Sequence, residues 1–84
     1  MDATPSSKAL EAVLKAAGSA HHDYEQNALG GTRDERWAEF YGAYVLGRLG
    51  DFVTPSELVG YLEDAPDDGD WAVSAAEYIL DILE

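Results

Sequence analysis

The sequence predicts an all-α fold, a compact four-helix bundle or orthogonal array built as a single domain over residues 1–84. Three observations support this prediction. Apolar and aromatic residues recur at helical spacing in four segments. Threonine, proline and glycine stand where those segments begin or end. No segment alternates apolar and polar residues for long enough to form a strand. We expect helices at about residues 5–29, 33–49, 55–64 and 70–83.

The first predicted helix is the longest and has signals at both ends. Thr4 is suited to its N-cap, and Pro5 to its first turn, where the missing N–H of proline is not needed. Gly30 and Gly31 end the helix, because glycine readily takes the left-handed conformation found after many helix C-termini. Gly18 lies inside it, where it marks a kink or a close contact with another helix.

The second predicted helix follows with almost no linker. Thr32-Arg33-Asp34-Glu35 has the form of a capping box, with threonine at the cap and glutamate three residues later. Gly47 and Gly50 close this helix. Because only a Gly-Gly turn separates the first two helices, we expect them to form an antiparallel hairpin.

The third and fourth predicted helices are shorter. Thr54-Pro55-Ser56-Glu57 is the clearest start signal in the chain, combining an N-cap threonine, a proline at the first position and a glutamate at the third. Pro66 disfavours helix at the residue before it. Asp70 can cap the last helix.

The charge of the chain limits its partners. Seventeen acidic residues face five lysines and arginines, giving a net charge of −12. This argues against direct binding to nucleic acid or to anionic membranes, because both require clustered cations. The acidity favours solubility or adaptation to high salt, or an acidic face that docks a basic protein, including an acidic mimic of nucleic acid.

Size and composition limit the chemistry further. An 84-residue chain has a radius of gyration of roughly 12 Å and a thin core, with room for one shallow groove. Cysteine is absent, and no apolar stretch approaches the ~20 residues of a membrane span. The N-terminus lacks the pattern of a signal peptide, so we expect a cytoplasmic protein. The chain has nine aromatic residues and a thin core, so a homodimer that buries some of these residues in its interface is an alternative.

The first candidate for chemistry is the segment around His21, His22 and Glu25, whose side chains are weak candidates for a metal site. Adjacent histidines point about 100° apart on a helix, so both cannot join one helix-borne site. The structural alternative is that His21 belongs to the apolar stripe as a partly buried aromatic. No cofactor is predicted.

The hairpin geometry gives the second candidate. Residues equidistant from the Gly-Gly turn lie at similar heights, which places His21 level with Phe40 and Tyr41, and Glu25 level with Arg36. One interpretation is a structural network of Glu25 with Arg36 or Arg33, roofed by Trp37. The other is a binding groove at the open edge of the hairpin. The candidate binding residues of this groove are His21, Tyr24, Glu25, Arg33, Trp37 and Tyr41.

Other catalytic and binding signatures are incomplete. The acidic loop at residues 64–70 resembles calcium chemistry, but Pro66 and Ala75 occupy two ligand positions of the EF-hand pattern. The attachment serine of acyl carrier proteins is missing, because Phe52 follows Asp51. No serine lies in a Gly-x-Ser-x-Gly motif. We therefore predict no catalytic residue and no enzymatic activity.

Two segments are similar to each other. Trp37-Ala38 is followed by Tyr44-Val45-Leu46, and Trp71-Ala72 by Tyr78-Ile79-Leu80, 34 positions later. This spacing is typical of some helical repeats, but the rest of a repeat signature is missing. We interpret the similarity as two core helices with similar anchors, and a tandem repeat is the alternative.

The stretch from Ala20-His21-His22-Asp23-Tyr24-Glu25 through Gly30-Gly31 to Arg33-Asp34 and Trp37 resembles the start of small uncharacterised helical proteins in bacteria. That resemblance implies no activity and no site residue. The leading hypothesis is a non-catalytic protein-interaction or regulatory module, with another protein as its partner. The alternatives are a ligand- or metal-binding accessory domain centred on His21, His22 and Glu25, and an acidic mimic of nucleic acid.

Overall fold

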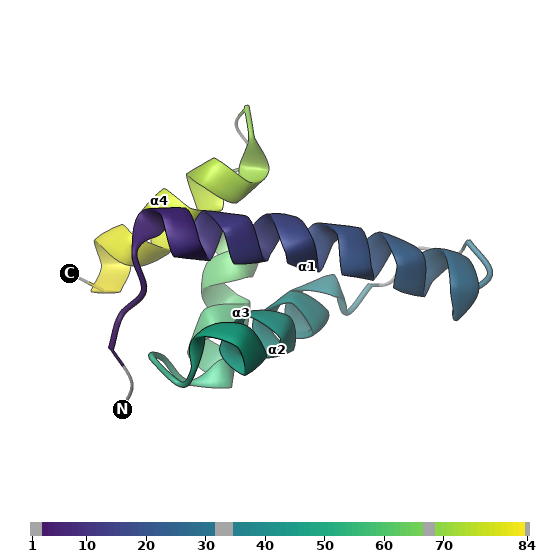
Figure 1. Cartoon of the computed structure of the whole chain (residues 1–84), viewed down its shortest axis with the longest axis horizontal. Coiled ribbons are helices and arrows are strands. Elements are labelled where there is room, and N and C mark those ends of the chain that lie inside the picture. The colour runs from purple at the N-terminus through teal and green to yellow at the C-terminus, as the bar shows by residue number, and fades with distance from the viewer. Residues whose placement is uncertain (1–2, 32–34, 67–68, 84) are drawn as a thin grey trace.

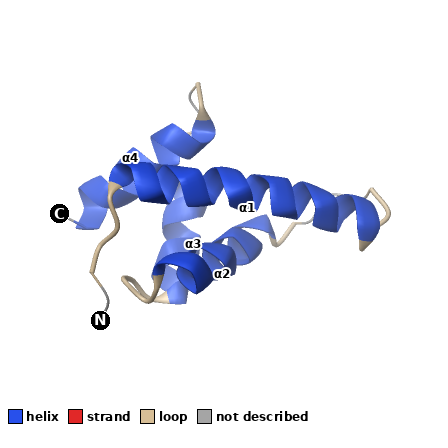
Figure 2. Ribbon diagram, viewed as in Figure 1, coloured by secondary structure: helices blue, strands red, loops and turns tan. Residues whose placement is uncertain are grey.

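Helices make up all of the regular secondary structure in a computed structural model of the protein, which describes residues 3–31, 35–66 and 69–83. They are α1 (Ser7–Asn27), α2 (Trp37–Leu49), α3 (Pro55–Asp64) and α4 (Trp71–Leu83). Figure 2 shows this described part of the chain as helix and loop, without strands. The all-α prediction is confirmed, and the predicted bounds of the third helix agree with those of α3.

The four helices are arranged as a closed ring of neighbours. Helix α1 packs against α2 and α4, and α3 packs against the same two helices. Figure 1 shows α3 running behind α1 at a steep angle, as in an orthogonal array. The Cα radius of gyration is 12.4 Å, close to the value expected for a compact chain of this length. Packing of α1 on α2 agrees with the expected pairing of these helices, while their antiparallel relation stays a prediction.

Each helix contributes aliphatic side chains to one small core. The largest fully buried side chains are those of Leu10, Leu14, Val45, Leu58, Leu62 and Ile79. Phe52 and Val53, in the connector before α3, are buried with them. Gly42 is buried where α2 packs on α3, and a Cβ at this position would lie in van der Waals contact with Cγ2 of Val59, at 3.4 Å. Burial of these side chains is the main stabilising contribution in so short a chain.

The ends of α1 differ from the prediction. Ser6, and not Thr4, is the N-cap, since its Oγ accepts a hydrogen bond from the Ala9 N–H at 3.2 Å. The helix therefore begins two residues later than expected, and Pro5 lies outside it. At the other end the helix stops at Asn27. Gly30 and Gly31 follow at φ of +63° and +88°, the left-handed conformation for which glycine was expected.

The start of α2 also differs. Residues 35 and 36 form a turn, and the helix begins at Trp37. Its first backbone bonds run from the N–H groups of Glu39 and Phe40 to the carbonyl of Arg36, and no side chain caps it. The predicted start of this helix at residue 33 is therefore too early, because residues 35 and 36 form a turn and are not helical. Three residues of the predicted capping box, Thr32 to Asp34, lie outside the described residues. Gly50, and not Gly47, ends the helix.

The predicted caps of α3 and α4 are confirmed. The Thr54 hydroxyl accepts a bond from the Glu57 N–H at 3.3 Å and donates one to the Glu57 carboxylate at 2.7 Å. Asp70 accepts a bond from the Ala72 N–H at 3.2 Å, which fixes the start of α4 at Trp71. Lys15 Nζ lies 3.5 Å from Asp70 Oδ2, so this cap is also tied to α1.

Candidate functional site

Four aromatic rings pack together where α1 meets α2. The His21 ring lies edge-on to Phe40 at a centroid distance of 5.0 Å and 5.4 Å from the Tyr41 ring. Tyr24 stacks on Phe40 at 5.3 Å. These four residues are called the hairpin cluster below. The contacts confirm that His21 lies level with Phe40 and Tyr41. The cluster is filled by its own rings, so it stabilises the packing of α1 on α2.

The two histidines occupy different environments. His21 is only 7% exposed, and its Nδ1 lies 3.7 Å from Oε1 of Glu25. His22, the next residue, is exposed on α1. Within the part of the chain that the structure describes, no three histidine, cysteine, aspartate or glutamate side chains lie close enough together to hold a metal ion. The structural interpretation of His21 as a buried aromatic of the apolar stripe is confirmed.

The structure describes some of the charged residues near the start of α2, but not all of them. Arg36 Nε lies 3.4 Å from Oε2 of Glu39, one turn along α2. Arg33 lies outside the described residues. The Trp37 ring packs against Tyr41 and Trp71, and the expected network of Glu25 with Arg36 or Arg33 beneath it stays a prediction. Trp37 is the first residue of α2, and this position directs its indole toward α4.

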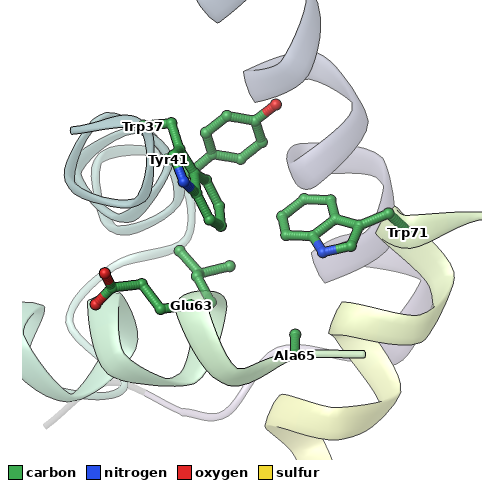
Figure 3. A pocket seen from close by; sticks show the side chains of 6 residues that line it. Trp37, Tyr41, Glu63, Ala65 and Trp71 are labelled. Atoms are coloured by element: carbon green, nitrogen blue, oxygen red, sulfur yellow. The ribbon is translucent and has the colours of Figure 1, made fainter. Parts of the chain in front are cut away.

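A recess of about 320 Å³ opens where the starts of α2 and α4 meet the end of α3. This hollow is called the aromatic recess below. The residues that line it are Trp37, Tyr41, Leu62, Glu63, Ala65 and Trp71. Figure 3 shows Trp37 and Tyr41 on one side and Trp71 on the other, with the Trp71 ring pointing toward the first two. Ala65 lies below them, and the Glu63 carboxylate points away from Trp71 at the rim.

Local structure explains why these rings meet. Trp37 and Trp71 are the first residues of α2 and α4, and each is followed by a buried alanine, Ala38 or Ala72. The small alanine side chain lets each helix start lie close to the core. Both indoles consequently lie half-buried at the same end of the ring of helices, in edge contact at a centroid distance of 5.8 Å.

Tyr41 belongs to both aromatic groups. Its ring contacts His21 in the hairpin cluster, and Trp37 and Trp71 in the aromatic recess. Burial raises the pKa of the Tyr41 hydroxyl, and the negative charge of Glu25 raises it further. The hydroxyl therefore stays neutral at physiological pH. It points away from the recess in Figure 3, so the recess presents the ring and not the hydroxyl.

The structure divides the predicted binding set. Trp37 and Tyr41 line the aromatic recess, while His21, Tyr24 and Glu25 lie at the α1–α2 contact. Sequence reasoning missed the remaining lining residues as site residues: Leu62, Glu63, Ala65 and Trp71. The signal for Trp71 was present in the 34-residue similarity, which places a Trp-Ala pair at the start of two helices.

Comparison with known proteins found no matching family model, no similar curated protein and no similar solved structure. Among the described residues, none of the helices combines the length and the apolar character that a membrane crossing requires. The residues of the chain itself therefore carry the functional argument.

Proposed function

We propose that the chain is a non-catalytic, cytoplasmic protein-interaction or regulatory module that binds a basic segment of a partner protein in the aromatic recess. The observation that carries this proposal is the half-burial of Trp37, Tyr41 and Trp71 around an open hollow. Tryptophan and tyrosine dominate binding energy at protein interfaces, because they present large, rigid contact areas.

The size of the recess favours a short segment over a folded domain. A volume of about 320 Å³ holds one or two anchoring side chains. Interfaces built on so few anchors bury less surface than about 1,200 Å² and are typical of transient complexes. The partner segment is thus expected to be a linear peptide that dissociates readily.

Charge supports the choice of a basic segment. Glu63 stands at the rim, none of the described lining residues is a lysine or arginine, and the whole chain carries a net charge of −12. A field of this sign attracts positively charged segments and raises their association rate. The same field is screened by salt, so binding should weaken as ionic strength rises.

A peptide selection tests the proposal. A random peptide library is displayed against the immobilised chain at moderate salt, and the selected peptides are measured by calorimetry. We expect basic peptides that lose about tenfold in affinity for a Trp71→Ala variant. Tyr24→Ala is the matched control, because Tyr24 is exposed on α1 outside the recess and its loss should leave affinity unchanged.

The folding of both variants is checked by thermal unfolding before binding is compared. A selection without basic binders contradicts the proposal, as do binders that are indifferent to Trp71→Ala or self-association of the chain through this surface.

A further inference from the structure

The orientation of the three rings restricts what the recess can bind. The planes of Trp37 and Tyr41 meet at 88°, those of Trp37 and Trp71 at 77°, and those of Tyr41 and Trp71 at 89°. Centroid distances are 5.4–5.8 Å. Three nearly perpendicular planes share no common direction, so a group that contacts all three rings cannot meet every one of them edge-on. Such a group meets at least one aromatic face.

An aromatic face attracts positive charge. The π-system carries negative potential above and below the ring, and tryptophan is the strongest of the three aromatic residues in this respect. Glu63 adds a full negative charge at the rim, and the other lining residues that the structure describes are uncharged. The electrostatics of the recess therefore suit an organic cation and disfavour a carboxylate or a phosphate.

The shape of the recess selects among cations. It is open to solvent, and both indoles are half-buried, so contact with the rings can offset only a small loss of hydration by an entering group. Arginine is suited to such a place, because its planar guanidinium is weakly hydrated, stacks on an indole face and forms two parallel hydrogen bonds to one carboxylate. The lysine ammonium is a compact, strongly hydrated charge that would have to give up more water.

We propose that the aromatic recess seats one arginine side chain of the partner segment, with its guanidinium against an indole face and paired with the Glu63 carboxylate. This inference rests on the proposed function and specifies its chemistry. The exposed Glu63 side chain stands at the end of α3, one residue before the helix ends, where it can turn toward a bound guanidinium.

The chain contains a built-in probe for this proposal. Its only two tryptophans, Trp37 and Trp71, both line the recess, so tryptophan signals report on this site alone. The probe ligands are terminally blocked Gly-Ser peptides with one central arginine, lysine or citrulline. Citrulline has nearly the shape of arginine without its charge. Binding is followed by tryptophan fluorescence and by the indole N–H resonances of the whole chain.

We expect the arginine peptide to shift both indole signals saturably, and the citrulline peptide to bind about tenfold more weakly. The lysine peptide should fall between them. Glu63→Gln should weaken arginine binding severalfold, while Glu77→Gln, an equal change of net charge on the exposed face of α4, should leave it unchanged.

Several results would overturn the arginine seat. They are equal binding of the citrulline peptide, tighter binding of the lysine peptide, equal effects of Glu63→Gln and Glu77→Gln, or no shift of either indole. If library-selected peptides still depend on Trp71 in these cases, the arginine seat is wrong and the interaction function stands. If they are indifferent to Trp71, the function itself is contradicted.

Discussion

At the scale of single residues, the aromatic side chains divide between a structural role and the binding role proposed above. His21 and Phe40 fill the contact of α1 with α2, whereas Trp37 and Trp71 line an open hollow. Tyr41 touches both groups, so it couples the packing of α1 to the wall of the recess. A substitution of a residue that packs against the Tyr41 ring is therefore expected to lower stability. It should also affect binding, because it changes the position of that ring.

The adjacent histidines give the first prediction. His21→Ala should lower the free energy of unfolding by about 2 kcal/mol, because it leaves a void beneath Phe40 and Tyr41. His22→Ala should change it by less than about 0.5 kcal/mol, since His22 is exposed. Urea unfolding at neutral pH measures both. Similar losses for the two variants would show that His21 has no special place in the packing.

Two glycines give the second prediction. Replacing an exposed glycine inside a helix by alanine stabilises the helix by about 1 kcal/mol. Gly47→Ala should reach this value, because among the described residues no atom outside its own helix backbone and its chain neighbours would lie within 4 Å of the added Cβ. Gly18→Ala should gain much less, since its Cβ would lie 3.3 Å from the Tyr41 hydroxyl, and the Tyr41 ring is held by His21, Trp37 and Trp71. Thermal unfolding distinguishes them, and an equal gain at both positions contradicts the close contact.

At the scale of elements, the sequence predicted helix existence well and helix ends less well. Thr54 and Asp70 cap where expected, because each is followed directly by a helical pattern. At α1 the signal was ambiguous, since Thr4 and Ser6 are both suitable caps. Local propensity does not distinguish the two positions, because serine and threonine are both favoured N-caps.

The competing caps give the third prediction. Ser6→Ala should destabilise the protein by about 1 kcal/mol, because the Ala9 N–H loses its partner. Thr4→Ala should have an effect below about 0.5 kcal/mol, since Thr4 lies before the helix and is exposed. Chemical unfolding curves of the two variants provide the comparison. A larger loss of stability for Thr4→Ala than for Ser6→Ala would mean that Thr4 is the N-cap and that α1 begins at Pro5.

At the scale of the whole molecule, charge opposes the compact state. A net charge of −12 on a chain with a Cα radius of gyration of 12.4 Å places many carboxylates within a Debye length of one another. Lys15 relieves part of this repulsion, with Nζ 3.1 Å from Glu11 and 3.5 Å from Asp70. The rest of the repulsion between carboxylates is reduced only through screening by dissolved ions.

The fourth prediction follows from this repulsion. The unfolding temperature should rise as sodium chloride increases from low to molar concentration, because salt screens the like charges more in the compact state than in the expanded one. Differential scanning calorimetry across this range is the measurement. An unfolding temperature that stays level or declines would mean that the acidic residues do not limit stability.

The aromatic recess could not be predicted from the sequence, whereas one contact between α1 and α2 could. The contact of His21 with Phe40 was predicted by placing both residues at equal distances from the Gly-Gly turn, although α1 ends at Asn27 and α2 begins only at Trp37, so the connection is longer than that turn. The meeting of Trp37 with Trp71 depends on the angle between α2 and α4, which are 34 residues apart at their starts and are joined through α3. Helical periodicity gives the inner face of each helix and leaves the angles between helices open.

The aromatic recess depends on the contact between the two indoles, which nuclear Overhauser spectroscopy of the whole chain can detect. Ring protons of Trp37 and Trp71 should give cross-peaks to each other, and both indoles should give further cross-peaks to the Tyr41 ring. Indoles that give cross-peaks only to their own helices would mean that α2 and α4 do not bring them together, and the aromatic recess would not exist.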